Sequence, residues 1–486
     1  MGIVLKQSFK NTIILIIGFA IGGVNALFLY TKFLKDEYYG LIIFLLSTAV
    51  LVLPLLVYGM QHAVVKYFSS YNTKKEQDQL LTWSLILPLF IIIPVAFLGS
   101  LFYDYISQSL SVKNPLIKDY TNLIFLVAIF MGYFEVFYAW VKVQMNSVFG
   151  NFIKEIFVRA GVTILLYCLH FDYINPNQFV YGVVILYFLR MLIMKIYAFS
   201  VYIPKFSLSR PNNFKVVLRY SFYLILAGSA GSILLEIDKF MIPQIEKLAE
   251  VAYYSVGVFI ASTVGIPNRA MQQITSPITA KDLNNNDFKA VAKLYKQSSI
   301  NLLVVGGLLF LLINLNIIEM YKMIDKPAFS VGVWIVLMIS ISELYKLALG
   351  TNGTILINSK YYRTFFYLSI AMAATVIVLN HFLIRSIGIN GAALATLITI
   401  LIFNTVKVWY INQKFDMYPF TKKTVFVLAL ILVLFGCFYS IELPFRPLIN
   451  IVLKSLMISV VYGIFIFKMN ISEDINEFIN GLIKRK

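Results

Sequence analysis

Four charged residues lie deep inside long apolar stretches of the chain, where their side chains could do chemistry. Arg190 and Glu343 fall about midway along their stretches, and Glu135 and Arg269 about two-thirds of the way. A charge inside hydrocarbon is costly, so it needs a wet cavity, an opposite charge or a ligand. A guanidinium offers a planar fork of donors that suits phosphate oxygens. The arginines therefore indicate an anion site within a membrane, or alternatively ion pairs with one of the two acids.

Other charged residues of the apolar stretches lie nearer the ends. A long basic side chain in such a place can reach the lipid headgroups, and this is the simpler interpretation of Arg159, Lys195, Lys346 and Lys454. Arg159 and Lys346 are nevertheless kept among the candidates for a central cavity. The candidate substrate-binding residues of a central cavity are Arg190, Arg269, Glu135, Glu343, Lys346 and Arg159.

The elements that must position these residues are transmembrane helices. The chain has 486 residues, of which 60% are hydrophobic and 13% charged, too apolar for one soluble core. Stretches of roughly 20 apolar residues, enough to cross a bilayer as a helix, recur along it. We predict an all-α polytopic membrane protein of about 14 spans, at 11–31, 39–65, 82–103, 120–141, 155–171, 179–203, 218–238, 251–276, 298–318, 331–350, 364–383, 388–411, 425–441 and 448–468.

The distribution of lysine and arginine predicts the orientation. Most basic residues fall in the two termini and the even-numbered loops, and short basic loops stay in the cytoplasm. Both termini are therefore expected on the cytoplasmic side. The net charge of +18 reflects this bias and contact with anionic lipid, so we do not interpret it as nucleic-acid binding.

The spans divide into two similar groups. The segment "YYGLIIFLLSTAV" (38–50) aligns with "YYSVGVFIASTVG" (253–265), and the same offset superposes the third and fourth spans on the ninth and tenth. We predict two six-helix lobes related by a pseudo-two-fold axis, a cleft between them and alternating access. The predicted parts are an N-terminal lobe 1–203, a cytoplasmic linker 204–217, a C-terminal lobe 218–411, and two further helices with a tail in 412–486.

Motifs for enzymatic chemistry are missing. The sequence contains no Gly-Lys pair, hence no phosphate-binding loop, and no HExxH or GxSxG. The loops are short, which leaves no room for a catalytic domain. The chain is therefore expected to be a transporter without a cofactor, and not an enzyme.

Three segments resemble a known family. They are "KQSFKNTIILIIGFAIGGVNALFLYTKFLKDEYYGL" (6–41), "LEIDKFMIPQIEKLAEVAYYSVG" (235–257) and "GINGAALATLITI" (388–400). They are similar to the polysaccharide-biosynthesis (O-antigen type) flippases of the multidrug/oligosaccharidyl-lipid/polysaccharide exporter superfamily. The likeness extends over nearly the whole chain.

The resemblance implies a flippase of the bacterial cytoplasmic membrane. Its substrate would be a polyprenyl-diphosphate-linked oligosaccharide used for surface polysaccharide. Its partners would be membrane lipid and polysaccharide assembly proteins, with no nucleic acid. A diphosphate and its sugars cannot cross hydrocarbon unaided. The expected mechanism holds the headgroup in the cationic cleft while the lipid tail stays in the bilayer.

The resemblance also implies a cation site in the second lobe. Asp238, Asn380 and Thr396 occupy the positions of its oxygen ligands, so coupling to Na⁺ or H⁺ is expected. The alternative is that "LEIDKF" ends a helix at the interface, with Glu236 and Lys239 paired at i,i+3 on the surface.

Two departures from relatives narrow the function. The lipid II flippases of the superfamily have basic residues along the first helix, and the span 11–31 has none. The multidrug exporters often have an acid there, whereas this chain has Asn25. The alternatives left open are a cation-coupled multidrug exporter of the same superfamily and a membrane polysaccharide polymerase.

Overall fold

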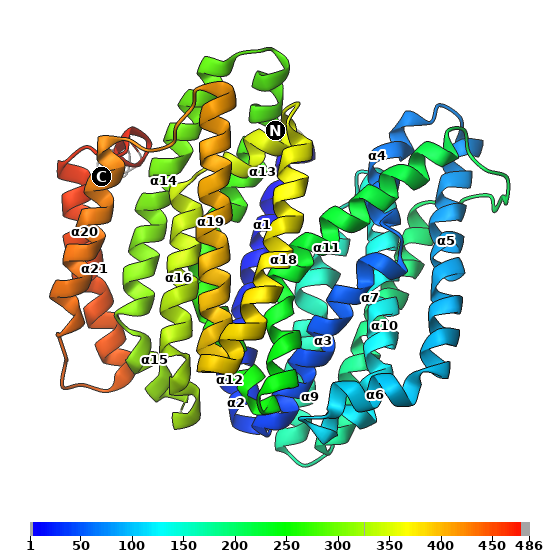
Figure 1. Cartoon of the computed structure of the whole chain (residues 1–486), viewed down its shortest axis with the longest axis horizontal. Coiled ribbons are helices and arrows are strands. Elements are labelled where there is room, and N and C mark those ends of the chain that lie inside the picture. Colours follow the sequence, from blue (N-terminus) through cyan, green and yellow to red (C-terminus); the bar gives the residue numbers. More distant parts are fainter. Residues whose placement is uncertain (1–2, 325, 478–486) are drawn as a thin grey trace. The chain divides into compact units, whose positions relative to one another are not determined.

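The protein forms two helical units. The computed structural model describes residues 3–324 and 326–477, which contain helices and no strand (Figure 1). The units are Met1–Ala252 and Tyr253–Lys486. Helix α11 (Phe214–Ile245) packs along α3 (Asp36–Leu56) and α4 (Met60–Tyr67) and so belongs to the first unit, although most of it follows the predicted linker 204–217. The two six-helix lobes and the two added helices stay a prediction.

The first unit combines helices long enough to cross a membrane with short helical turns. They are α1 (Ile3–Val24), η1 (Asn25–Leu29), α2 (Tyr30–Phe33), α3 (Asp36–Leu56), α4 (Met60–Tyr67), η2 (Phe68–Ser70), α5 (Lys74–Leu101), α6 (Tyr103–Ser111), η3 (Pro115–Tyr120), α7 (Thr121–Val143), α8 (Val148–Phe152), η4 (Ile153–Phe157), α9 (Val158–His170), α10 (Pro176–Val201) and α11 (Phe214–Ile245). Helix α7 is central, because it packs against α3, α4 and α10.

The second unit likewise combines helices long enough to cross a membrane with short helical turns. Its helices are α12 (Leu248–Ser262), which begins in the first unit, η5 (Thr263–Gly265), α13 (Ile266–Asn284), α14 (Phe288–Asn314), α15 (Ile317–Ile324), η6 (Pro327–Gly332), α16 (Val333–Ala348), α17 (Asn352–Asn358), α18 (Tyr362–Ile387), α19 (Ile389–Phe415), α20 (Lys422–Tyr439) and α21 (Pro447–Lys468). Helix α14 packs against α13, α16, α20 and α21, and α19 against α16 and α18.

Twelve helices of the described chain are long and apolar enough to span a membrane. The predicted spans 155–171 and 218–238 coincide with η4–α9 and with α11, which are not among the twelve. The segment η4–α9 contains three charged residues, Lys154, Glu155 and Arg159. For α11, some of the side chains lie outside the described part of the structure. The all-helical membrane fold is confirmed, and the count of fourteen stays a prediction.

Two predicted spans are interrupted. The span predicted over 39–65 breaks between α3 and α4, where Tyr58 and Gly59 both have positive φ. A Cβ at Gly59 would crowd the carbonyl oxygen of Ser221. Glycine therefore allows both the positive φ at this position and the close approach of the Ser221 backbone. The span predicted over 251–276 is divided by the short 3₁₀ turn η5. Hydropathy alone does not reveal such breaks because both halves remain apolar.

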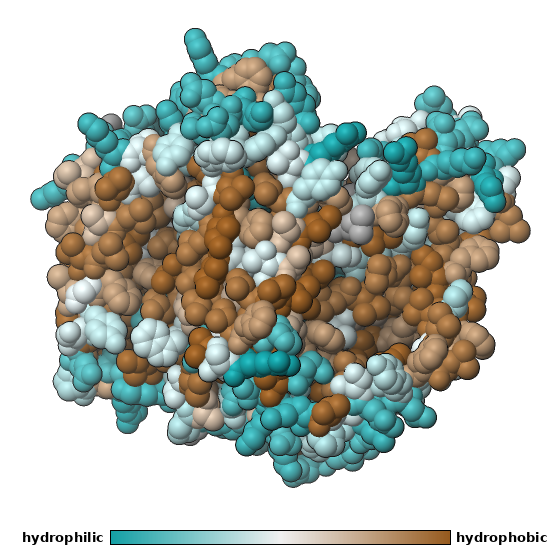
Figure 2. Space-filling model, viewed as in Figure 1, coloured by the Kyte–Doolittle hydropathy of each residue, from teal (hydrophilic) through white to brown (hydrophobic). Residues whose placement is uncertain are grey.

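Burial separates inner helices from lipid-facing ones. In the span that contains α7, 67% of the most apolar window is buried, against 17% for the spans of α1 and α5. The visible surface of both units carries a broad hydrophobic belt between hydrophilic ends (Figure 2). A helix that exposes apolar residues along its length requires lipid as its solvent. Glu135 of α7 therefore lies on an inner helix and not on one that faces lipid along its length.

Candidate functional site: two basic clusters

Three helical segments of the first unit bring Glu135, Lys154 and Arg190 together. Glu135 lies on α7, Lys154 on η4 and Arg190 midway along α10. The Nζ atom of Lys154 lies 2.6 Å from Oε1 of Glu135, and Nη2 of Arg190 lies 3.9 Å from the same oxygen. The predicted pairing of Arg190 with Glu135 is thus present, but a lysine that the sequence analysis did not select holds the closer position.

The guanidinium of Arg190 is the most deeply placed cation of this group. The residue is 8% exposed, and its Cζ lies 3.8 Å from the centroid of the Phe134 ring, which fixes the plane of the guanidinium. At 3.9 Å the Glu135 contact is an ion pair and too long for a hydrogen bond. Within the described part of the chain, the buried Nε of Arg190 has no acceptor. A buried donor without an acceptor is unfavourable, so this guanidinium has capacity for an oxyanion.

Arg159 lies against the first helix of the chain. Its Nη1 is 3.0 Å from the Glu155 carboxylate, one helical turn earlier. A Cβ placed at Gly18 or Gly22 of α1 would press on the Arg159 side chain. The two glycines therefore let an arginine of α9 lie along α1, which has no basic residue of its own between 11 and 31.

Asn25 ties the same two helices together. Its Nδ2 donates to the backbone carbonyl of Arg159 at 2.8 Å, and Thr163 Oγ1 donates to its Oδ1 at 2.8 Å. Asn25 begins the π-helical turn η1, and a second π-helical turn, η4, precedes Arg159. Each extra residue in such a turn rotates the following side chains by about 100°. These turns thus help to set where Lys154 and Arg159 point.

We call Glu135, Lys154, Glu155, Arg159 and Arg190 the first-unit basic cluster. Three cations and two carboxylates leave one net positive charge. Lys142, near the end of α7, adds a further cation over the Tyr138 ring at 3.9 Å. The cluster can therefore hold a polyanion and carries too few acids to neutralise itself.

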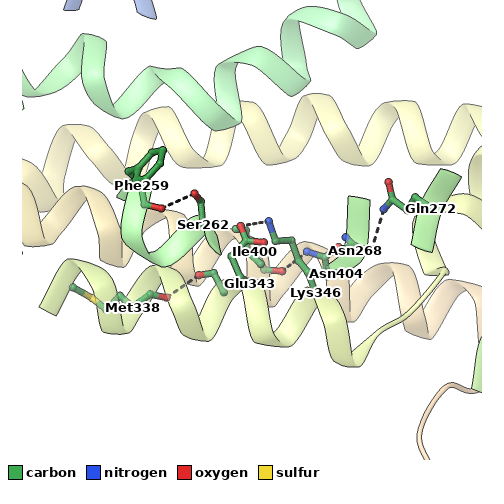
Figure 3. A network of polar contacts seen from close by, with 10 residues as sticks. Phe259, Ser262, Asn268, Gln272, Met338, Glu343, Lys346, Ile400 and Asn404 are labelled. Carbon is green, nitrogen blue, oxygen red and sulfur yellow. Dashed lines mark hydrogen bonds and ion pairs between the residues drawn. The ribbon is translucent and has the colours of Figure 1, made fainter. Parts of the chain in front are cut away.

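The second unit holds a comparable group around Glu343. Lys346 Nζ lies 2.5 Å from Glu343 Oε1 within α16, and Figure 3 shows the pair in a region bordered by Ser262 and Asn404. A Cβ at Gly265 of η5 would overlap the Glu343 carboxylate. Glycine therefore provides the room in which this carboxylate lies, and the partner of Glu343 is Lys346 and not Arg269.

Lys407 completes what we call the second-unit basic cluster, together with Glu343 and Lys346. It lies on α19, is 7% exposed, and its Nζ is 5.0 Å from the centroid of the Phe365 ring. Lys407 was not among the residues selected from the sequence, although its position four residues inside the predicted span 388–411 was a usable signal. Arg269, by contrast, is exposed on α13. No described carboxylate forms an ion pair with Arg269.

The predicted cation ligands fall in both units. Asp238 on α11 is buried in the first unit, while Asn380 on α18 and Thr396 on α19 are buried in the second, where these helices pack together. The three-residue cation site stays a prediction.

The alternative interpretation concerned Glu236 and Lys239, which lie beside Asp238 on α11. Lys239 and Ser47 both contact Glu236 Oε2 at 2.8 Å. The i,i+3 pair of Glu236 and Lys239 is thus present, but it is partly buried against α3 and does not lie on an open surface.

Replacement of Lys407 by methionine should raise stability and lower transport. A buried ammonium without a carboxylate partner opposes folding, and an apolar side chain of similar volume removes this cost. We expect the unfolding free energy to rise by at least about 1 kcal/mol, seen as a higher thermal midpoint in detergent. The exposed Lys414 on the same helix is the control, and Lys414→Met should change neither property. A lower midpoint for Lys407→Met would contradict this account.

Comparison with known families assigns the chain. A sequence model of the family described as polysaccharide biosynthesis protein matches residues 5–265, more than half of the chain. The chain belongs to this family. None of the curated proteins compared with it matches. The matched part includes every residue of the first-unit basic cluster.

Solved structures with the same fold are membrane transporters. The chain is similar to "Lipid II flippase MurJ, inward closed conformation", with a TM-score of 0.72 and 14% identity over 95% of this chain and 99% of that one. It is also similar to an inward-facing multidrug resistance MATE family transporter of the MOP superfamily, with a TM-score of 0.64 and 11% identity over 84% and 98%. A third match is a MOP superfamily transporter from Pyrococcus furiosus, with a TM-score of 0.55 and 10% identity over 85% and 96%.

The family and the fold together define the protein class. This member of the polysaccharide biosynthesis family is a multi-pass membrane protein with the fold of flippases and transporters. The resemblance seen in the sequence is confirmed. Solved relatives in inward-facing and outward-facing conformations show that this fold supports alternating access.

Proposed function

We propose that the protein moves a polyprenyl-diphosphate-linked oligosaccharide across the bacterial cytoplasmic membrane for surface-polysaccharide biosynthesis. The observation that carries the proposal is the buried Arg190 guanidinium, which has an unused Nε donor in a cluster of net positive charge. The oxygens of a diphosphate can accept the hydrogen bond that Nε of Arg190 does not make within the described structure. The family, whose description is polysaccharide biosynthesis, supports the same class of substrate.

The mechanism follows from where the charges lie. The diphosphate enters with its sugars from the cytoplasm, and the first-unit basic cluster neutralises it, with Arg190 and Arg159 as the fork-shaped donors. The polyprenyl tail remains in the bilayer because hydrocarbon needs no carrier through lipid. The second-unit basic cluster provides further cations within the second unit.

A lipid II flippase among the structural relatives supports a lipid-linked substrate. The first helix of this chain has no basic residue between 11 and 31, which favours an oligosaccharide carrier over a peptidoglycan precursor. Arg159 contributes a cation beside α1 from a neighbouring helix instead. The assignment of Arg269 to the substrate site is kept as part of the proposal, with its exposed side chain available to sugars or phosphate.

A flipping assay tests the proposal directly. The full chain is reconstituted into vesicles that contain a short fluorescent polyprenyl-diphosphate oligosaccharide, and a membrane-impermeant reagent measures its appearance in the outer leaflet. We expect protein-dependent flipping, and no efflux of cationic dyes. Dye efflux without flipping would assign the protein to the multidrug exporters instead.

Coupling is tested in the same vesicles. We propose Na⁺ or H⁺ as the driving ion, with Asp238, Asn380 and Thr396 as ligands. A Na⁺ gradient is compared with a pH gradient in the wild type and in Asp238→Asn. Gradient-driven flipping that survives Asp238→Asn unchanged would remove Asp238 from the coupling site.

A further inference from the structure

A cavity outside both basic clusters lies in the second unit. It has a volume of about 350 Å³ and is bounded by the end of α14, by α15, by the start of α16 and by the α20–α21 hairpin. Its walls are largely apolar, with Ile318, Trp334, Leu337 and Phe435 among them. Its charged residues come from α15, from the turn between α20 and α21, and from α21. The cavity therefore has an apolar part and a charged part, as a lipid-binding site requires.

Lys454 is the buried charge of this cavity. It lies on α21, is 8% exposed, and its Nζ donates to the carbonyl of Ile441 at 3.0 Å. An ammonium has three donors, and the carbonyl takes one of them. The side chain also lines the cavity, so its remaining donors are available to an acceptor that enters there. Lys454 is therefore a buried cation with donors to spare at the wall of the cavity.

The other charges of the cavity balance this lysine. Lys322 and Glu319 form an ion pair with each other at 2.7 Å. Glu442 also lines the cavity, is exposed, and forms no ion pair within the described residues. Two cations and two carboxylates give a net charge of zero. The group best matched to Lys454 and Glu442 is thus one that carries both a negative and a positive charge.

The depth of the site matches a lipid headgroup. Lys454 is the eighth residue of α21, which places it roughly 10 Å along the helix from its first residue. Trp334, 62% exposed, is of the type that concentrates at the boundary between headgroups and hydrocarbon. On either side of Lys454, α21 exposes Val452 and Leu456, which suits contact with acyl chains.

We propose that this cavity binds the headgroup of a zwitterionic phospholipid with a primary ammonium, of the phosphatidylethanolamine type. Lys454 donates to the phosphodiester, Glu442 accepts from the ammonium, and the apolar wall contacts the acyl chains. Both contacts are charge-assisted hydrogen bonds, which are the stronger class. The site is separate from the basic clusters, and the proposal does not depend on the proposed function.

Native mass spectrometry of the full chain in detergent tests this site. Phosphatidylethanolamine, phosphatidylcholine and phosphatidylglycerol are titrated separately against the wild type, Lys454→Met, Lys454→Arg and Glu442→Gln. The control is Lys468→Met, which removes an exposed lysine at the other end of α21. We expect phosphatidylethanolamine to bind the wild type about tenfold more tightly than phosphatidylglycerol, and Lys454→Met to lose about tenfold. Lys454→Arg and Lys468→Met should retain the wild-type affinity.

Glu442→Gln separates the two charges of the headgroup. It should remove the preference for phosphatidylethanolamine over phosphatidylglycerol while phosphatidylglycerol binding is kept. Because Glu442 is exposed, this variant carries the test even if Lys454→Met fails to fold. Equal affinity for the three lipids, tighter binding of phosphatidylglycerol, or phosphatidylethanolamine binding that neither substitution weakens would overturn the proposal.

Discussion

Arg190→Met is expected to reduce flipping of a polyprenyl-diphosphate oligosaccharide at least about tenfold. A hydrogen bond to a charged group contributes about 1.5 to 3 kcal/mol, and 1.4 kcal/mol corresponds to a factor of ten. Methionine can fill the space beside Phe134 without offering a donor. Glu135 keeps Lys154 at 2.6 Å, so the substitution leaves no carboxylate without a partner. The measurement is the initial flipping rate in vesicles at equal protein content.

Two companion variants show whether charge or geometry matters. Arg190→Lys keeps the charge but loses the planar fork, so an intermediate rate is expected. Lys195→Met removes an exposed cation from the same helix α10 and should flip at the wild-type rate. The thermal midpoint of Arg190→Met should not fall, because an unsatisfied buried donor is removed. A wild-type rate for Arg190→Met would refute the role of Arg190 in substrate binding.

Gly40→Ala is expected to disfavour the conformation seen here and so to slow transport. Gly40 lies on α3, where a Cβ would overlap the carbonyl oxygen of Leu248, and backbone at this contact cannot move aside cheaply. Asn114 fixes the same corner, since its Nδ2 donates to Pro243 O at 2.6 Å and its Oδ1 accepts from Leu248 N at 2.8 Å. Overpacking costs about 1 to 3 kcal/mol, enough to change a two-state population about fivefold or more.

The effect is conformational if the predicted lobes move. Gly40 and Asn114 belong to the predicted lobe 1–203, whereas Pro243 and Leu248 belong to the predicted lobe 218–411, so the contact between α3 and the α11–α12 corner would open in the opposite state. A cysteine at position 248, in a chain without its two native cysteines, reports this opening by its rate of reaction with a membrane-impermeant maleimide. Gly40→Ala should accelerate the reaction about tenfold.

Gly99→Ala is the matched control for this prediction. Gly99 lies on α5, and a Cβ there would have no neighbour within 4 Å. The variant should leave both maleimide labelling and flipping unchanged. If Gly40→Ala lowers the thermal midpoint and leaves labelling unchanged, the close contact serves only stability and the α3–α12 corner is not a gate.

The sequence by itself determined that lipid surrounds the helices, that the fold is all-helical, and that Arg190 and Glu343 lie far from the ends of their apolar segments. The hydropathy of a segment measures how well that segment alone is accommodated by lipid. Transmembrane helices could therefore be predicted one at a time, without knowledge of their neighbours. The same local argument selected Arg190 and Glu343, because a charge far from both ends of an apolar span is unusual wherever the helix lies. The repeat at 38–50 and 253–265 and the three family segments depend on local sequence too.

Only the tertiary structure decided which charges meet. Lys154 is the partner of Glu135, Lys346 is the partner of Glu343, and Lys407 is buried beside Phe365. Such contacts depend on the rotation of each helix about its axis, and the π-helical turns η1 and η4 change that rotation within a span. Hydropathy does not record this rotation, because an apolar helix keeps its mean hydropathy whichever face it turns inward. Packing between helices sets it, and packing requires the whole fold.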